Sequence, residues 1–349
     1  MAGAALRQTL LGAWQRRGLL AWLLWPLSLA YLCLWHVRHL LYRTGLKSTE
    51  RVQVPVIVVG NVVAGGGGKT PLVIALVQHL QAMGLHPGVV SRGYGRTGSD
   101  CRSVTADAVA SEVGDEPLLI HRRTGAPVQV AARRIDAARA LLATHPDVDL
   151  LVCDDGLQHL GLHRDIEICV FDGQGIGNGF LLPAGPLREP WPRSTDLVVR
   201  SGDLPTGTAH QVARRLADHA IAADGHKVAL TDLASSAPSR PIQAVAGIAH
   251  PQTFFAMLRE RGLPLDATRA LPDHAAFDTL PWPDTADAML LCTEKDAVKL
   301  WPLRPDALAV PLEVTLAPAF WVALTQHLRR CGPHAWDARL SSNHGHTPS

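Results

Sequence analysis

The sequence lacks the patterns that mark zinc sites, disulfide frameworks and strongly basic nucleic-acid binders. Its six cysteines are scattered, and no two form a Cys-x-x-Cys pair, which argues against zinc or disulfide scaffolds and suits a reducing compartment. The 17 histidines include no His-Glu-x-x-His pair of the zinc hydrolases. A formal net charge of +2 argues against a nucleic-acid partner. With 349 residues and 47% hydrophobic content, the chain is long enough for two α/β domains.

A glycine-rich loop before Lys69 and Thr70 is the most informative motif that is present. An apolar run at residues 54–59 predicts a strand before the loop, and residues 72–83 predict a helix after it. In such a unit the backbone N–H groups converge on phosphate oxygens, the lysine reaches the β- and γ-phosphates, and the threonine hydroxyl binds Mg²⁺. The predicted nucleotide-binding residues are Gly65, Gly66, Gly67, Gly68, Lys69, Thr70 and Pro71.

Two positions beside this loop narrow the class of nucleotide-binding protein. Val63 stands where the strict P-loop pattern has its first glycine. Ala64 stands where partition- and export-type ATPases carry a second lysine, which weakens the interpretation as a membrane-recruited switch ATPase. The chain also lacks a guanine-reading [NT]KxD motif, because the Lys and Asp of residues 293–296 are adjacent. ATP is therefore the expected nucleotide.

A strand predicted at residues 150–153 ends in two carboxylates, Asp154 and Asp155. P-loop enzymes use an Asp at a strand end to hold Mg²⁺, directly or through water. These two residues and Thr70 are therefore the predicted metal ligands, although only one carboxylate need touch the ion.

Three further segments carry polar groups suited to a reaction on a phosphate. Residues 91–96 place Arg92 and Tyr94 among glycines after a predicted strand, a pattern typical of an anion- or sugar-binding loop but also of an ordinary turn. The Gly- and Pro-rich stretch 173–192 predicts a long ordered loop near a site. Transfer to a hydroxyl needs a base, and an Asp oriented by a His would serve. The spacing alone does not bring the acidic segment at Asp115 to His274.

The N-terminal region contains an uncharged run at residues 18–35, rich in Leu and Trp and flanked by basic residues. No small-residue cleavage site follows it, which argues against a signal peptide. The run is at the short limit for a membrane-spanning helix and contains Pro26. Its tryptophans and basic flanks favour a helix in the membrane interface on the cytoplasmic face, where ATP is available. A buried core helix is the remaining alternative.

Strand and helix patterns alternate after this segment, which predicts an α/β fold. We expect a P-loop NTPase core with a parallel sheet flanked by helices, then a second, smaller α/β domain with strands at residues 227–231 and 308–314. Pro311 should confine the last strand to a sheet edge. The predicted divisions are a membrane-associated helix at 1–48, the P-loop core at 49–205, a C-terminal α/β domain at 206–332 and a flexible tail at 333–349.

Taken in order, these motifs resemble the tetraacyldisaccharide 4'-kinases, the lipid A kinases of Gram-negative bacteria. Each motif is short, but the ordered set is specific to that family, in which a valine at position 63 is also usual. The chain departs from the family pattern at Ala249, where glycine is usual, and at Ala275, where a second histidine is frequent. The matching stretches lie at residues 58–71, 91–96, 114–117, 154–159, 182–189, 245–251, 272–274 and 293–299.

The resemblance implies a reaction and a location. The γ-phosphate of ATP would pass to the 4'-hydroxyl of a tetraacylated glucosamine disaccharide 1-phosphate to give lipid IVA, with Mg²⁺ as cofactor. The enzyme would be monotopic, in contact with lipid on the cytoplasmic face of the bacterial inner membrane. The sequence does not determine the oligomeric state, and a monomer is the expectation. Competing hypotheses are a membrane-attached P-loop ATPase that drives a partner protein and a nucleotide-binding module without catalysis.

The resemblance also implies residue roles. Asp115 is expected to be the catalytic base, His274 its partner and Lys69 the phosphate ligand. Asp154 and Asp155 are expected at the metal site with Thr70. The implied acceptor or nucleotide contacts are Arg92, Tyr94, Arg134, Gln158, His159, Arg188 and Glu189.

Overall fold

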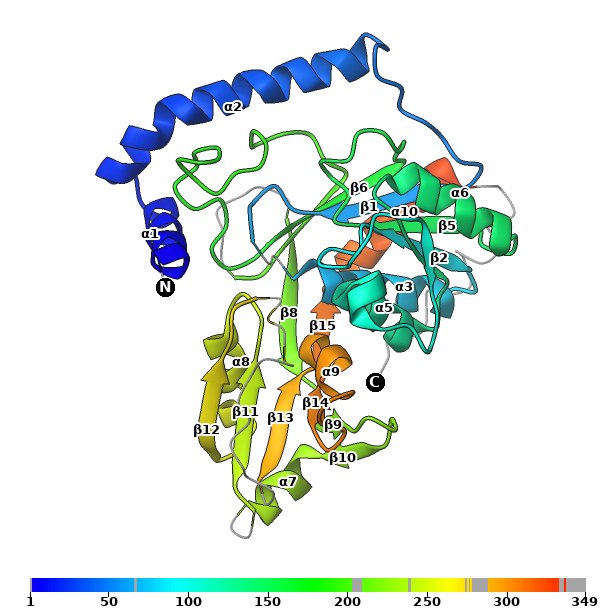
Figure 1. Ribbon diagram of the computed structural model, residues 1–349. Coiled ribbons are helices and arrows are strands. Elements are labelled where there is room, and N and C mark those ends of the chain that lie inside the picture. Colours follow the sequence, from blue (N-terminus) through cyan, green and yellow to red (C-terminus); the bar gives the residue numbers. More distant parts are fainter. Residues whose placement is uncertain are drawn as a thin grey trace.

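The chain forms two α/β units joined by a pair of strands (Figure 1). The computed structural model describes residues 2–65, 68–202, 209–237, 240–273, 275, 277, 288–332 and 336. A nine-stranded sheet organises the first unit and a six-stranded sheet the second. The predicted α/β fold with a second, smaller unit is confirmed.

The first sheet is built around strand β1 (Val56–Gly60), which runs parallel to β5 (Leu150–Asp154) on one side and to β6 (Ile166–Phe171) on the other. These strands are nearly continuous apolar runs because helices cover both faces of the sheet. The sheet continues beyond β5 through β2 (Pro87–Ser91), β4 (Val128–Val130) and β3 (Arg102–Val104), and beyond β6 through β7 (Leu197–Arg200), β8 (His210–Leu216) and β15 (Leu312–Leu316).

Each face of this sheet packs against its own apolar cluster. Helices α3 (Lys69–Ala82) and α10 (Pro318–Cys331) cover one face, and α6 (Arg134–Thr144) covers the other. The spacing of Leu72, Leu76 and Leu80 places them on one stripe of α3, and all three are fully buried. Two shorter helices, α4 (Ala110–Val113) and α5 (Asp115–Thr124), follow β3.

The second unit begins after β8 and ends where β15 returns to pair antiparallel with β8. Its core lies between its sheet and the helices α7 (Leu230–Ser236) and α8 (Pro251–Glu260), while α9 (Glu294–Leu300) follows β13. The strand order is β10 (Lys227–Ala229), β9 (His219–Ile221), β14 (Leu308–Val310), β13 (Met289–Thr293), β11 (Ile242–Ala246) and β12 (Leu265–Ala270).

Two predicted strands are wrong in their limits. The strand expected at residues 308–314 divides at Pro311 into β14 and β15, which belong to different sheets. Pro311 has no N–H to donate to a ladder, so the chain can leave one sheet and enter the other there. The strand expected at 227–231 ends at Ala229, and Leu230 begins α7. The domain limits at residues 48, 205 and 332 stay a prediction.

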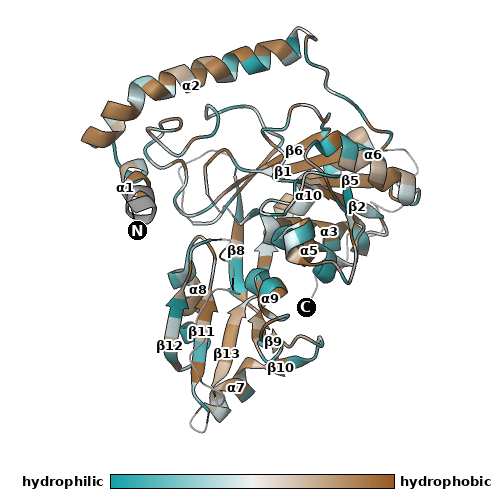
Figure 2. Ribbon diagram, viewed as in Figure 1, coloured by the Kyte–Doolittle hydropathy of each residue, from teal (hydrophilic) through white to brown (hydrophobic). Residues whose placement is uncertain are grey.

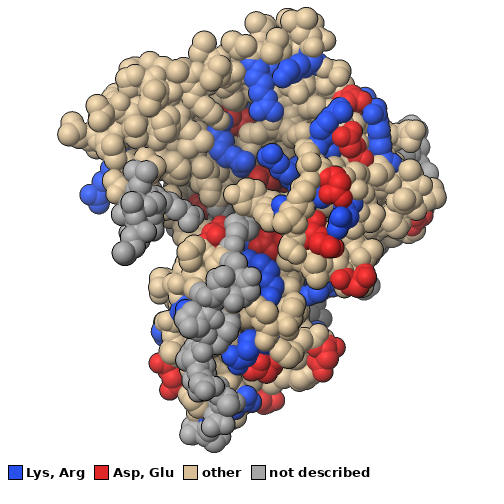
Figure 3. All heavy atoms as spheres, viewed as in Figure 1, with Lys and Arg blue, Asp and Glu red and all other residues tan. Residues whose placement is uncertain are grey.

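The N-terminal region forms α1 (Ala2–Gln15) and α2 (Leu19–Arg43). Within the described ranges, α2 is the one helix whose length and hydropathy would allow it to cross a membrane, and 11% of its most apolar window is buried. The buried residues of α2 are Ala21 and Ser28, so the alternative of a core helix is wrong. Figure 2 shows α2 hydrophobic along most of its length, and Figure 3 shows few charged side chains over it.

Candidate functional site

The candidate residues gather at one edge of the first sheet. In a parallel sheet the carboxyl ends of all strands meet at the same edge, where ligands of such folds bind. The glycine loop follows β1, the segment 91–96 follows β2, Arg134 follows β4, Asp154 ends β5, and the loop at 173–192 follows β6. The structure therefore brings together segments that are more than 100 residues apart in the sequence. Gly66 and Gly67 lie outside the described residues.

Lys69 opens α3 and points toward Asp155. Its Nζ lies 3.6 Å from Asp155 Oδ1 and donates to Asn61 Oδ1 at 3.3 Å. Arg188 Nη1, from the long loop, contacts the same two acceptors at 3.2 and 3.0 Å. Burial raises the pKa of the Asp155 carboxyl, but the positive charges of Lys69 and Arg188 outweigh burial and hold this pKa below its usual value. Asp155 has φ 47°, in the left-handed region that strains a residue with a Cβ and that is concentrated at functional sites.

Asp154 is the most unusual carboxylate of the site. It is 1% exposed, and both of its oxygens lack a hydrogen-bond partner in the described part of the chain. Burial, helped by the charges of Glu116 and Asp155 and opposed by Lys69, raises its pKa to about 7. A buried carboxylate is stable when it is paired or binds a metal.

The residues around Asp154 fit a small divalent cation. Its register partner is Val59 on β1, next to the start of the glycine loop, and Thr70 is buried in the first turn of α3. Mg²⁺ takes one or two carboxylates together with hydroxyl, phosphate and water oxygens. No group of three or more His, Cys, Asp or Glu side chains arranged for a metal occurs among the described residues. A site for Mg²⁺ shared with phosphates therefore fits better than an all-protein cage.

Asp115 begins α5 and is 4% exposed. Its Oδ1 accepts a hydrogen bond from Glu116 N at 3.0 Å, and its Oδ2 lies 3.3 Å from Lys299 Nζ of the second unit. Gly114 before it has φ 94°, and a Cβ there would lie 2.9 Å from Gly93 Cα. Glycine is thus required at 114, because the backbone of the 91–96 loop packs directly against it. His274 lies outside the described residues, so its predicted pairing with Asp115 stays a prediction.

The 91–96 loop presents Arg92 and Tyr94 as exposed side chains. His159 is partly buried, and its Nε2 accepts from Arg134 N at 3.1 Å. Burial, with the charges of Arg134 and Arg164, lowers the pKa of His159 to about 4. His159 is therefore neutral, and because Nε2 accepts, Nδ1 carries the proton.

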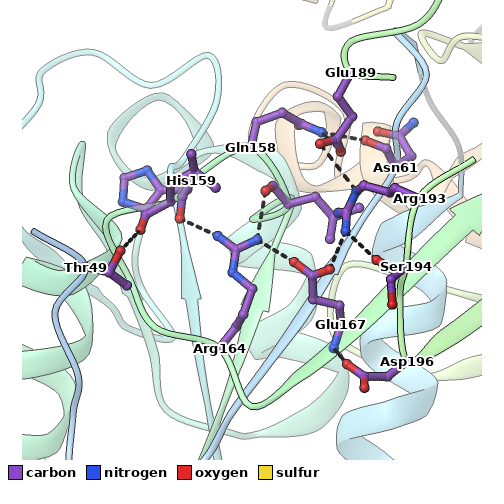
Figure 4. A network of polar contacts seen from close by, with 12 residues as sticks. Thr49, Asn61, Gln158, His159, Arg164, Glu167, Glu189, Arg193, Ser194 and Asp196 are labelled. Atoms are coloured by element: carbon purple, nitrogen blue, oxygen red, sulfur yellow. Dashed lines mark hydrogen bonds and ion pairs between the residues drawn. The ribbon is translucent and has the colours of Figure 1, made fainter. Parts of the chain in front are cut away.

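Gln158 and Glu189 belong to a network of polar contacts that joins Asn61 to Arg193 and Glu167 (Figure 4). Gln158 Nε2 donates to Glu189 Oε1 and to the Asn61 carbonyl, both at 3.0 Å. Arg193 Nε lies 3.5 Å from Glu189 Oε2, and Arg193 Nη1 donates to Glu167 Oε2 at 2.6 Å. Glu189 is 3% exposed. The network holds the loop after β6 against the end of β1, so it positions Arg188.

Helix α2 also contacts this edge of the sheet. Tyr31 Oη donates to the Arg188 carbonyl at 2.6 Å, and Arg38 Nη2 donates to the Gln158 carbonyl at 2.8 Å. Ser28 Oγ donates to the Leu181 carbonyl at 2.8 Å. The apolar helix is therefore bound to the two segments that carry Gln158 and Arg188.

Sequence reasoning missed several residues of this site. Asn61 accepts from both Lys69 and Arg188, and its only signal was its place between the predicted strand and the glycine loop. Lys295 and Lys299 stood in a matching stretch to which no role was assigned. Lys295 Nζ lies 3.1 Å from Glu116 Oε1 and 3.2 Å from Asp273 Oδ1.

Comparison with known proteins gives one consistent result. The sequence profile of the family described as Tetraacyldisaccharide-1-P 4'-kinase matches residues 20–329. A tetraacyldisaccharide 4'-kinase of Acidovorax ebreus is 58% identical over 325 residues, covering 93% of this chain and 95% of the relative. Another, from Polaromonas naphthalenivorans, is 54% identical over 350 residues, covering 98% and 99%. A solved structure of LpxK from Aquifex aeolicus in complex with ATP matches with a TM-score of 0.76 and 26% identity, covering 90% of this chain and 100% of that one.

Proposed function

The chain belongs to the tetraacyldisaccharide-1-P 4'-kinase family of lipid A biosynthesis, and on that premise we propose which of its residues perform the transfer and how. The γ-phosphate of ATP passes to the 4'-hydroxyl of the acylated disaccharide 1-phosphate at the carboxyl edge of the first sheet. One observation carries this assignment: Lys69 Nζ and Arg188 Nη1 lie 3.6 and 3.2 Å from Asp155 Oδ1, next to the buried Asp154. The start of α3, the end of β5 and the loop after β6 therefore meet at one pair of carboxylates.

ATP binds with its phosphates at residues 65–70, where the αL conformation of Gly68 (φ 68°) leads into α3. Support comes from the solved relative in complex with ATP. Lys69 and Arg188, which now share Asp155, are the cations placed to neutralise the transferred phosphate. Thr70, Asp154 and Asp155 would hold Mg²⁺, which when bound supplies further charge neutralisation on the phosphate oxygens.

Asp115 serves as the general base. The 4'-oxygen forms a bond to the γ-phosphorus while the bond from that phosphorus to the β–γ bridging oxygen breaks, and ADP leaves. The hydroxyl proton passes to the Asp115 carboxylate. His274 is proposed as the partner of Asp115 from the family motif alone.

The acceptor lies on the exposed side of this site. Arg92 and Tyr94 are exposed there, and His159 offers an Nδ1–H donor from a neutral ring. Arg134 is 4% exposed and donates from Nη2 to the Asp154 and Asp155 carbonyls at 3.3 and 3.2 Å. Arg134 therefore holds the backbone that carries the two proposed metal ligands, Asp154 and Asp155. Gln158 and Glu189 act by holding the Arg188 loop.

The enzyme is proposed to attach to the cytoplasmic face of the inner membrane through α2 lying in the interface. Contacts with the first unit run from Trp22, whose ring centroid is 5.1 Å from that of Phe180, to Arg38. That docked length is about 24 Å at about 1.5 Å per residue. If the helix were perpendicular to the bilayer, it would carry the polar loop at 173–192 into the hydrocarbon layer. Each backbone N–H or C=O group left there without a hydrogen bond would cost roughly several kcal/mol. The interfacial orientation keeps that loop in water.

Transfer of labelled γ-phosphate from ATP to purified acyl-disaccharide 1-phosphate in mixed micelles tests this function. We expect label in the lipid only when protein, Mg²⁺ and acceptor are all present. If ATP is hydrolysed as fast without the acceptor as with it, the protein is an ATPase. Binding of ATP without turnover would indicate a nucleotide-binding module.

A further inference from the structure

Two lysines of the second unit reach carboxylates of the candidate active site. Lys295 and Lys299 are four residues apart on α9 and therefore lie on the same face of that helix. Lys299 Nζ lies 3.3 Å from Asp115 Oδ2, and Lys295 Nζ lies 3.1 Å from Glu116 Oε1. Figure 3 shows basic and acidic side chains meeting where the two units face each other.

The two helices run antiparallel, which explains the order of these pairs. The acidic residues stand in the first turn of α5, while Lys299 stands in the last turn of α9. At the opposite end, Arg123 in the last turn of α5 donates from Nη1 to both carboxylate oxygens of Glu294 at 2.7 Å. The charges of Asp115, Glu116, Arg123, Glu294 and Lys299 suit the dipoles of their own helices as well as their partners, whereas Lys295 lies in the first turn of α9, where the dipole opposes a positive charge. The interface therefore has a reaction end, at Asp115, and a remote end, at Glu294.

The position of α9 is fixed from within its own unit. Thr293 Oγ1 accepts from Asp296 N at 3.2 Å and donates to Asp296 Oδ2 at 2.7 Å. Gly247 N donates to the same oxygen at 2.9 Å, and Asp296 is completely buried. This N-cap ties α9 to the loop after β11. The threonine and the aspartate of the 293–299 segment thus position the helix, and its two lysines are left to act across the interface.

Lys299 is held in a defined place. Besides Asp115, its Nζ donates to the Ala275 carbonyl at 3.2 Å and lies 5.5 Å above the Phe277 ring. Its side chain is 18% exposed and that of Asp115 is 4% exposed. An ion pair between groups this buried is stronger than an ion pair in water, because the surroundings screen the charges less. Lys299 is therefore placed to fix one carboxylate oxygen rather than to provide a diffuse positive field.

A base needs the features that this contact supplies. The Asp115 carboxylate must be ionised, and an adjacent ammonium stabilises the ionised form. It must also keep one orientation, and here Oδ1 is fixed by Glu116 N and Oδ2 by Lys299 Nζ. A pair that only joined the two units could stand at the remote end, where Arg123 and Glu294 already do so.

We propose that Lys299 is a positioning residue for phosphoryl transfer, which holds Asp115 ionised and oriented from the second unit and makes the chemistry depend on docking of α9 against α5. This inference rests on the proposed role of Asp115 as the base. Lys299 itself takes no proton and touches neither ATP nor acceptor. Its removal therefore lowers kcat and leaves both KM values nearly unchanged.

The test compares four full-length variants with the wild type in the labelled-phosphate assay in mixed micelles: Lys299→Met, Lys299→Arg, Glu294→Gln and Asp115→Asn. Loss of the ion pair on Asp115 predicts a fall in kcat of about 10- to 100-fold for Lys299→Met, with each KM within about threefold. Lys299→Arg keeps the charge and should recover most of kcat. Glu294→Gln, the matched control at the remote end, should stay within about threefold of the wild type.

A double variant separates positioning from a merely structural role. In the Asp115→Asn background, Lys299→Met should lower kcat by less than about threefold, because a residue that acts through Asp115 has nothing left to position. An equal loss in both backgrounds, an equal loss in Glu294→Gln, or a wild-type kcat in Lys299→Met would each overturn the inference. If Lys299→Met does not purify as a folded protein, Lys299→Gln replaces it, and the same results support or overturn the inference.

The same experiment distinguishes failure of the Lys299 role from failure of the proposed function. A normal kcat in Asp115→Asn removes the proposed base and this inference with it. An impaired Asp115→Asn beside a normal Lys299→Met leaves the proposed function intact and removes only the role of Lys299. Absence of label in the lipid for the wild-type protein would contradict the proposed function itself.

Discussion

Replacing Asp154 by asparagine should stabilise the ligand-free protein at neutral and alkaline pH. Asp154 is fully buried, and its two oxygens make no hydrogen bond to another described residue. Asparagine has the same shape and no charge, so Asp154→Asn removes the cost of burying a carboxylate. A residue kept for a metal is expected to destabilise the protein that lacks the metal.

The magnitude and its sign follow from the pKa. Burial raises the folded-state value from 3.8 to about 7, and about 3 units correspond to about 4 kcal/mol. Because the folded value is the higher one, the folded protein binds a proton between about pH 4 and pH 7 that the unfolded chain does not bind. Its stability therefore falls as pH rises through that window. The variant and the wild type should be equally stable near pH 4 and differ by up to about 4 kcal/mol above pH 7.

Thermal unfolding of the detergent-solubilised protein without Mg²⁺ or nucleotide measures this difference. At about 2 cal/mol/K per residue, 349 residues give an unfolding entropy of about 0.7 kcal/mol/K, so Tm should rise by up to about 6 °C at pH 8. Asp232→Asn, a change at an exposed position on α7, should shift stability by less than about 0.5 kcal/mol. Addition of Mg²⁺ and a non-hydrolysable ATP analogue should stabilise the wild type more than Asp154→Asn. A variant less stable than the wild type at pH 8, or a difference independent of pH, would contradict a free-energy cost of burying the Asp154 carboxylate.

Four other perturbations probe the site and the anchor. Lys69→Ala should abolish transfer with Tm unchanged within a few degrees, and wild-type transfer would contradict the P-loop role. Asp115→Ala should lower kcat by ~10²–10⁴, whereas a loss of acceptor affinity alone would assign Asp115 to binding. Deletion of residues 1–45 should release the protein from membranes in a sedimentation assay, and continued sedimentation would reveal another anchor. Tyr31→Phe removes the hydrogen bond to the Arg188 carbonyl, worth about 1 kcal/mol, so kcat should fall about fivefold with membrane binding retained; an unchanged kcat would show that Tyr31 does not position Arg188.

Much of the first unit could be predicted because its strands and helices are marked by patterns within short stretches of the sequence. The strands β1, β5 and β6 are nearly continuous apolar runs of five or six residues, interrupted only by Glu167 in β6 and by Asp154 at the end of β5. The helix after the glycine loop repeats its leucines every four residues. Once the sheet is taken as parallel, the carboxyl ends of its strands must share an edge. The meeting of Lys69 with Asp155 follows from that rule alone, although the two residues are 86 positions apart.

The rest depends on contacts that no local pattern encodes. Gly114, directly before the first residue of α5, packs on the backbone of Gly93. Nothing in the sequence indicates that these two glycines meet. The pairing of Asp115 with Lys299 joins two units across 184 positions. Short helices such as α9, with seven residues, carry too few periodic positions to be distinguished from a turn. Sequence reasoning could therefore identify the acidic segment and the lysine segment but not bring them together.

The contacts of α2 connect membrane attachment to the chemistry more directly than a tether would. The helix binds the backbone carbonyls of Arg188 and Gln158 rather than side chains at a distance. Those two residues in turn contact Asn61, which also receives Lys69. A chain of hydrogen bonds thus runs from α2, the proposed interfacial helix, to Lys69, the proposed phosphate ligand. The acceptor is a lipid whose headgroup lies at the depth at which Trp22 and its neighbours would rest. On the proposed interfacial attachment, an anchor built into the site would fix the height of the γ-phosphate above the bilayer, and a flexible tether of the same hydrophobicity would not.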